Sequence, residues 1–148
     1  MQTTEQFAPA AQHVRFALPV RVYYEDTDAA GVVYYANYLR YCERARTECL
    51  REIGFEQQTL LARQRIAFVV RSVQADYLSP GLLDDALRVL SHLESLGGAS
   101  LVFRQKIVRG DDLLFEGRFV IACVNLDKKR PVPLPTEVRT KLEELAQA

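Results

Sequence analysis

The sequence predicts a single α+β domain in which one long helix covers one face of an antiparallel sheet. Three features support this fold class: a β-patterned run near the N-terminus, one long amphipathic run after it, and four further β-patterned runs joined by short turns. Strands joined by tight turns pair antiparallel, and a helix with one apolar face buries that face against another layer.

The first strand is expected from Val14 to Tyr24, where Val, Phe, Leu and Tyr predominate, although Pro19 weakens its first half. The long helix is expected from Ala36 to Ile53. Its apolar residues recur at steps of three and four, and they are Tyr38, Cys42, Ala45, Cys49 and Ile53. Gly54 stands where a glycine commonly ends a helix, and a short second helix is expected over residues 56–63.

The four later strands are expected over residues 66–78, 87–96, 100–108 and 113–125. The joints between them contain Ser79-Pro80-Gly81, Gly97-Gly98 and Gly110-Asp111-Asp112, which are typical turn sequences. A terminal helix is expected over residues 136–146. We therefore interpret residues 1–148 as one domain, with a core of about 14–126 and a C-terminal extension of about 127–148.

Composition narrows the class of partner. The chain has 19 basic and 19 acidic residues, so no overall field favours nucleic acid or an anionic membrane. No window approaches the roughly 18 to 20 apolar residues of a membrane span. Residues 1–13 contain neither a basic run nor a long apolar segment, so a cytoplasmic location is expected.

Cysteine and histidine usage argues against a metal site. The three cysteines, Cys42, Cys49 and Cys123, lack CxxC spacing, and the two histidines, His13 and His92, lie far apart in sequence. Cys42 and Cys49 are seven residues apart on one helical face, which separates them by about 10 Å and favours two small core residues over a disulfide.

The segment from Tyr24 to Tyr38 carries the chemistry. Asp26 and Asp28 end a β-patterned run, Gly31 follows, and the long helix then begins. A helix N-terminus offers unpaired N–H groups and partial positive charge, so it can hold an oxyanion while a nearby carboxylate acts as base or nucleophile. The alternative is that both acids are solvated loop residues or turn caps.

The string YEDTDAAGVVYYANYLRYCERARTE resembles the signature of the hotdog-fold acyl-CoA thioesterases of the 4-hydroxybenzoyl-CoA thioesterase type, and most of all their Tol–Pal-associated branch. The likeness continues through ARQRIAFVVRSVQADYLSPGLLDD and GGASLVFRQKIV and covers about residues 17 to 126. It implies a hotdog fold, in which a five-stranded antiparallel sheet wraps around one long helix. It also implies a homodimer or homotetramer whose acyl site lies between subunits.

The resemblance assigns roles residue by residue. The catalytic aspartate of the family falls on Asp28, as general base or as nucleophile, and the oxyanion donor is the backbone amide of Tyr35. Many Tol–Pal-associated members carry histidine at the position of Tyr35, and a tyrosine cannot replace a histidine as a base at neutral pH. Gly31 allows a tight backbone path or a close approach by the acyl group, or it is an ordinary loop glycine. Tyr34 and Tyr38 are expected in the core or the pocket wall.

The implied reaction is hydrolysis of an acyl-CoA thioester to a free acid and CoA, with no metal or redox cofactor, since coenzyme A is part of the substrate. The candidate phosphate contacts by charge are Arg71, Arg88, Arg104, Lys128, Lys129 and Arg130, of which the run Lys128-Lys129-Arg130 is the best local cluster. The alternative is that they are solvated surface charges. Short aliphatic, longer aliphatic and aromatic acyl groups all stay open, as does acyl carrier protein as the carrier. Two alternatives are a non-catalytic scaffold that docks cell-envelope or lipid-synthesis proteins, and a hotdog dehydratase, although neither histidine lies in a dehydratase-like motif.

Overall fold

A computed structural model describes residues 16–147. Its strands are β1 (Phe16–Arg21), β2 (Ile66–Tyr77), β3 (Ala86–Leu96), β4 (Ser100–Arg109), β5 (Asp112–Asn125) and the short β6 (Arg130–Pro131). Its helices are α2 (Tyr35–Glu52), α3 (Gln57–Gln64) and α4 (Thr136–Gln147), with a 3-10 turn, η1 (Tyr24–Asp26), before α2. The predicted start of the first strand, at Val14, lies outside the described residues.

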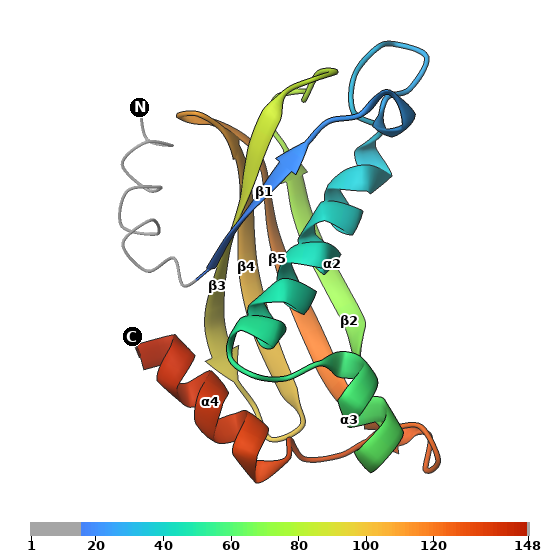
Figure 1. Ribbon diagram of the computed structural model, residues 1–148, viewed down its shortest axis with the longest axis vertical. Coiled ribbons are helices and arrows are strands. Elements are labelled where there is room, and N and C mark those ends of the chain that lie inside the picture. The colour runs from blue at the N-terminus through green and yellow to red at the C-terminus, as the bar shows by residue number, and fades with distance from the viewer. Residues whose placement is uncertain (1–15, 148) are drawn as a thin grey trace.

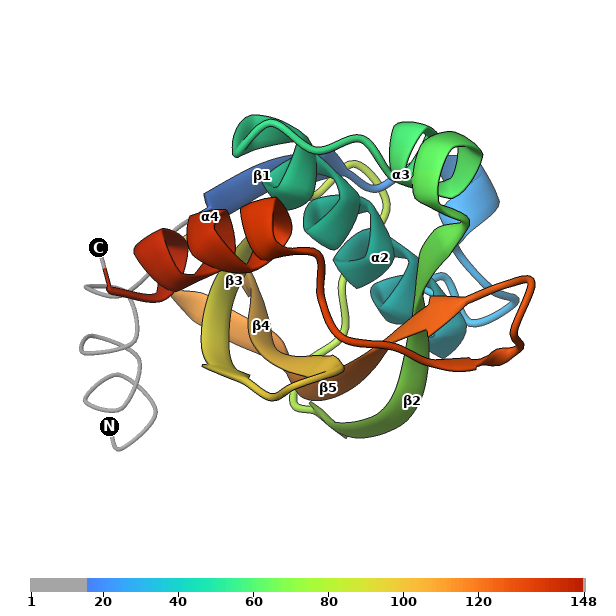
Figure 2. The ribbon, with the colours of Figure 1, turned by 90° about the horizontal axis from the view of Figure 1, so that it is seen from below.

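The strands form one antiparallel sheet in the order β1-β3-β4-β5-β2, with β6 paired to the end of β5. The sheet curls around α2, which runs along its concave face (Figure 1). Seen from below, α2 lies inside the curl, with α3 and α4 near opposite edges (Figure 2). The predicted α+β fold is confirmed, and β6 is a two-residue addition to the five expected strands.

The buried face of α2 is the one that the apolar spacing predicted. Tyr38, Cys42, Ala45 and Cys49 are at most 3% exposed. The helix ends one residue before the predicted limit, and Gly54 follows with a φ of 102°, a conformation that glycine adopts without strain. All three cysteines are buried free thiols, which confirms the interpretation of Cys42 and Cys49 as core residues.

Arg46 is a charged residue that lies inside this core. The guanidinium carbon of Arg46 lies 4.6 Å from the ring centroid of Phe119, and its Nη1 donates a hydrogen bond of 2.8 Å to Gln105. The amide nitrogen of Gln105 in turn donates to the carbonyl of Cys42 and to the hydroxyl of Ser91. Buried polar groups need hydrogen-bond partners, and the partners found here join α2 to β3 and β4.

Two expectations need correction. The first strand ends at Arg21 rather than Tyr24, because the chain turns into η1, where the Asp26 N–H donates to the Tyr23 carbonyl and the Asp26 carboxylate accepts from the Tyr23 N–H. The C-terminal extension contributes to the core, since Val138 and Leu142 of α4 are fully buried. Because α4 packs on β3, its apolar residues join the core, which the family motif did not predict.

Candidate active site

The segment between η1 and α2 forms a tight loop that carries Asp28. The Asp28 N–H donates to the Val32 carbonyl at 2.9 Å, and the Gly31 N–H donates to the Asp28 carbonyl at the same distance. Gly31 has a φ of 81°, and a Cβ at that position would meet no atom within 4 Å. The positive φ supports a tight backbone path as one reason for this glycine, and the close approach of an acyl group stays a prediction.

The Asp28 side chain is exposed and held in one orientation. Its Oδ1 accepts a hydrogen bond of 2.9 Å from the Ala30 N–H, which is the turn-stabilising contact foreseen as the alternative role of an acid here. Among the described residues Oδ2 has no hydrogen-bond partner. The carboxylate can therefore have both predicted roles. Oδ1 stabilises the turn, and Oδ2 is free to contact a water molecule or a carbonyl carbon as a base or nucleophile.

Asp26 holds the loop against the helix. Its carboxylate accepts from the Tyr23 N–H at 2.8 Å, and its carbonyl accepts from the Tyr34 N–H and from the side-chain amide of Asn37. Asn37 is buried at the first turn of α2 and was not singled out from the sequence. A polar residue on the otherwise apolar face of the helix was the signal available for it. Asp26 thus has the turn-stabilising role expected of it.

The N-terminus of α2 is open. Tyr34 precedes the helix and provides no side-chain cap, and Tyr35 is the first helical residue. The Asn37 N–H bonds to the Tyr34 carbonyl at 2.8 Å, whereas the described residues provide no acceptor for the Tyr35 N–H. Aligned peptide dipoles place about half a positive charge at such an end, so the Tyr35 amide is suited to an anionic oxygen.

A second loop, residues 78–85 between β2 and β3, packs against the Asp28 loop. The Val33 N–H donates to the Gly81 carbonyl at 2.9 Å, and the Gly81 N–H donates to the Tyr38 hydroxyl at 2.8 Å. Val32 also forms an isolated β-bridge with Leu82. The sequence analysis described this segment only as a turn, because its contact with the Asp28 loop depends on how β2 and β3 are placed.

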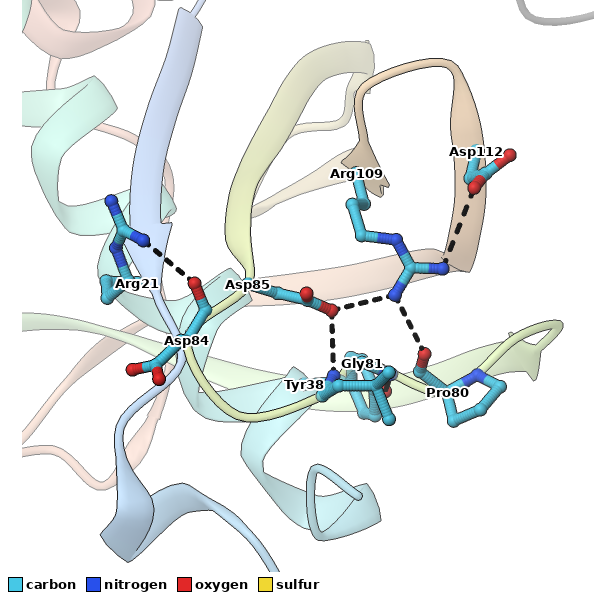
Figure 3. Close-up of polar contacts among 9 residues, drawn as sticks. Arg21, Tyr38, Pro80, Gly81, Asp84, Asp85, Arg109 and Asp112 are labelled. Carbon is cyan, nitrogen blue, oxygen red and sulfur yellow. Dashed lines mark hydrogen bonds and ion pairs between the residues drawn. The ribbon is translucent and has the colours of Figure 1, made fainter. Parts of the chain in front are cut away.

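Arg109, the last residue of β4, holds the loop of residues 78–85 in place. Its guanidinium donates to the Asp85 carboxylate at 2.7 Å and to the Pro80 carbonyl at 3.3 Å (Figure 3). Asp85 also accepts from the Leu82 N–H. Partial burial raises the pKa of the Asp85 carboxyl, but the hydrogen bonds from Arg109 and Leu82 outweigh burial and lower it below its usual range. Asp85 is therefore ionised near neutral pH, and the loop is held by a charged contact.

A hollow of about 240 Å³ lies beside the open end of α2. Its lining comes from α2, the end of β2 and the two loops, and comprises Val33, Tyr35, Tyr38, Tyr77, Leu78, Ser79 and Pro80. Burial raises the pKa values of Tyr38 and Tyr77. Both phenols are therefore neutral at physiological pH and serve as aromatic walls rather than bases.

The predicted site residues fall into two groups. Asp28, Gly31, Tyr34, Tyr35 and Tyr38 share one short stretch from the loop to the first turn of α2. Arg71 lies apart, at an irregular point of β2 and six residues before Tyr77, which is about 20 Å along a strand. Its role in substrate binding stays a prediction.

The described part of the chain contains no group of three or more His, Cys, Asp or Glu side chains that could hold a metal ion. Over the same residues, no helix is both long and apolar enough to cross a bilayer.

Comparison with known proteins places the chain in a family. Residues 22–142 match the model of the thioesterase-like superfamily. The acyl-CoA thioesterase YbgC of Haemophilus influenzae is 48% identical over 130 residues, which cover 88% of this chain and 96% of the relative.

Solved structures confirm the hotdog fold. A probable thioesterase from Bartonella henselae superposes with a TM-score of 0.77 at 34% identity, covering 80% of this chain and 98% of the other. A hypothetical protein from Thermus thermophilus gives a TM-score of 0.82 at 27% identity, covering 88% and 98%.

Proposed function

The chain belongs to the thioesterase-like superfamily, and we propose that it is an acyl-CoA thioesterase that uses Asp28 and the Tyr35 amide to hydrolyse the thioester. The observation that carries this proposal is the pairing of a half-anchored carboxylate with an uncapped helix N-terminus beside an aromatic hollow. The similarity to an acyl-CoA thioesterase over 88% of the chain supports the same reaction.

The Tyr35 amide would bind the carbonyl oxygen of the thioester. Charge builds on this oxygen when the carbonyl carbon becomes tetrahedral, and a preorganised N–H at a helix N-terminus stabilises that charge. A backbone donor does not depend on the attached side chain. The tyrosine at position 35, where many Tol–Pal-associated proteins have histidine, therefore leaves this part of the mechanism intact.

Asp28 would act on the carbonyl carbon in one of two ways. As a general base, Oδ2 takes a proton from water while the water oxygen bonds to the carbonyl carbon; as a nucleophile, Oδ2 itself forms the bond, and water then cleaves the mixed anhydride. In both routes the C–S bond breaks and CoA leaves as a thiolate, which needs little help from an acid because a thiol pKa is near 8.5. The anchored Oδ1 fits either route.

The assembly that we propose is a homodimer, or a tetramer of two dimers, joined along β2. In the described chain, β2 has a partner strand on the β5 side alone. Its side chains include the exposed apolar residues Val69, Val70, Val73 and Tyr77. An exposed apolar edge strand is a template for pairing with another copy, and such pairing would bring a second chain beside the hollow that Tyr77 lines.

Coenzyme A, or the phosphopantetheine of acyl carrier protein, is the proposed carrier. Arg71 is exposed on the β2 edge and stays our candidate for a phosphate contact. We place the reaction in the cytoplasm, where the three free thiols would stay reduced.

A panel of acyl-CoA thioesters assayed for free thiol release tests the proposal. We expect turnover on at least one member and its loss in Asp28→Asn. Absence of turnover on every thioester, with acyl carrier protein included as carrier, would contradict the proposal and favour the scaffold alternative. Formation of a 2-enoyl product from 3-hydroxyacyl-CoA without thiol release would favour the dehydratase alternative.

A further inference from the structure

The hollow beside the Tyr35 amide has a closed, aromatic base. Val33 and Tyr38 are at most 4% exposed, and Phe115 behind them is fully buried. The rings of Tyr38 and Phe115 are stacked, with centroids 5.5 Å apart and planes within 3°. A group that enters the hollow from the Tyr35 amide therefore meets a wall rather than a passage through the protein.

Tyr77 closes the same hollow from the strand side. Its ring meets Phe115 edge-on at 5.2 Å and Tyr38 at 5.5 Å between centroids. It also meets the ring of Tyr35 at 6.0 Å and 82°. One side chain from β2 thus spans the distance between the closed base and the residue whose amide is the oxyanion donor.

The size of the hollow limits what it can hold. Pockets that bury drug-sized ligands have volumes of about 300 to 1,000 Å³. The hollow of one chain has about 240 Å³, below that range, and by itself suits a short aliphatic chain or a single ring. Its lining, mainly aromatic and aliphatic, matches the apolar acyl group better than the polar pantetheine arm.

The two tyrosines of the wall differ in what else they do. The Tyr38 hydroxyl accepts the hydrogen bond from the Gly81 N–H, so its removal would also disturb the loop of residues 78–85. Tyr77 is 46% exposed, and its contacts in the described chain are with other aromatic rings. Tyr77 can therefore change without the loss of a hydrogen bond that supports the site.

We propose that Tyr77 is the specificity-determining residue of the site and that its ring restricts the acyl group to a short chain or a single ring. This inference rests on the proposed thioesterase function. It identifies the acyl class from the closed base, the aromatic contacts and the volume of the hollow. A smaller side chain at position 77 would enlarge the hollow on its β2 side and admit longer chains.

The test compares kcat/KM for acetyl-, butyryl-, hexanoyl-, decanoyl-, palmitoyl- and benzoyl-CoA in the wild type and in variants of Tyr77. For the wild type we expect higher values with butyryl- or benzoyl-CoA than with decanoyl- and palmitoyl-CoA. In Tyr77→Ala the ratio of decanoyl- to butyryl-CoA should rise at least about tenfold, since even one methylene in an apolar pocket changes discrimination by 10-fold or more. Tyr77→Leu, which retains part of the apolar cover, should shift the ratio in the same direction and decides the matter if the alanine variant does not fold.

Two controls isolate the ring. Tyr77→Phe retains the ring and, whatever its absolute rate, should keep the wild-type ratio. Tyr24→Ala removes a tyrosine that is 82% exposed and does not line the hollow, so it should also keep that ratio.

The possible failures are distinguishable. If the wild type hydrolyses none of the thioesters, the proposed function is wrong and this inference falls with it. A wild type that prefers palmitoyl-CoA, or an active wild type whose length profile is unmoved in both Tyr77→Ala and Tyr77→Leu, would overturn the role of Tyr77 alone.

Discussion

Arg109 and Asp85, 24 residues apart in sequence, form a hydrogen-bonded ion pair of 2.7 Å that ties the end of β4 to the loop before β3. The same guanidinium reaches the Pro80 carbonyl, and the carboxylate accepts from the Leu82 N–H. Gly81, which follows Pro80 in this loop, forms hydrogen bonds with both Val33 and Tyr38. The Arg109–Asp85 pair therefore holds the loop whose residues contact the lining of the hollow, and so supports the wall of the hollow.

Removing the cation of this pair should destabilise the protein. In Arg109→Met the Asp85 carboxylate keeps its partial burial and loses its partner, and we expect a cost of about 1–2 kcal/mol, since both side chains retain some contact with water. Urea unfolding measures it. The control is Arg65→Met, which breaks the more exposed pair with Asp127 and should cost less than about 0.5 kcal/mol. Equal costs for the two variants would contradict a supporting role for Arg109.

The same pair should make stability depend on pH. Because the pKa of Asp85 is lower in the folded than in the unfolded protein, its stabilisation is present above the unfolded pKa and is lost as the pH falls through the folded one. Below about pH 4 the free energy of unfolding should fall more steeply in the wild type than in Asp85→Asn. Glu94, whose pKa is also lowered by its contacts with Arg118 and Arg104 against the opposing effect of burial, remains in both proteins and cancels in the comparison. Parallel curves from pH 7 to pH 3 would show that Asp85 contributes nothing.

Asp28→Asn should lower kcat by about 10²–10⁴ while leaving the melting temperature almost unchanged. The asparagine oxygen can still accept from the Ala30 N–H, so the turn is kept, but the negative charge is gone. Assays of thiol release and thermal unfolding on the same preparation measure both effects. Asp26→Asn is the control and should retain more activity, because the Asp26 carboxylate accepts from the Tyr23 N–H and only Asp28 falls at the catalytic position that the resemblance implies. Near wild-type turnover in Asp28→Asn would remove the central residue of the mechanism.

Activity should not depend on a metal ion. A carboxylate with an oxyanion donor suffices for a thioester whose leaving group is a thiolate. Overnight treatment with a chelator should therefore leave turnover intact. A large loss of activity that zinc or manganese restores would show that a metal takes part.

The protein should be at least a dimer joined through β2. Light scattering is expected to give a mass of twice or four times the 16.8 kDa of one chain. Val73→Lys places a charge on the exposed apolar edge of β2 and should shift the mass toward a single chain at micromolar concentration. Ala17→Lys, on the opposite edge strand β1, is the control and should leave the mass unchanged. A wild type with the mass of one chain would contradict the assembly.

Local pattern was sufficient for most of the elements. The long helix, its end at Gly54 and the four later strands lie within two residues of their predicted limits. The first strand was predicted too long. It ends early where the Tyr23 N–H donates to the Asp26 carboxylate, and such a specific contact leaves no periodic pattern in the sequence. The burial of Arg46 could not be predicted either, since the residues that contact its guanidinium, Phe119 and Gln105, are far away in sequence.

The sequence by itself determined the succession of strands and helices along the chain, because that succession depends on near neighbours, where side-chain spacing and backbone preference act directly. Through its resemblance to a family, the extended motif also predicted Asp28 as the acid before the long helix. Only the tertiary structure decided that Tyr77 closes a hollow with Tyr38 and Phe115, and that Arg109 supports its wall. Those contacts join strands and loops that are distant in sequence, so they depend on the register of the sheet and on its curl around α2, which no local pattern encodes.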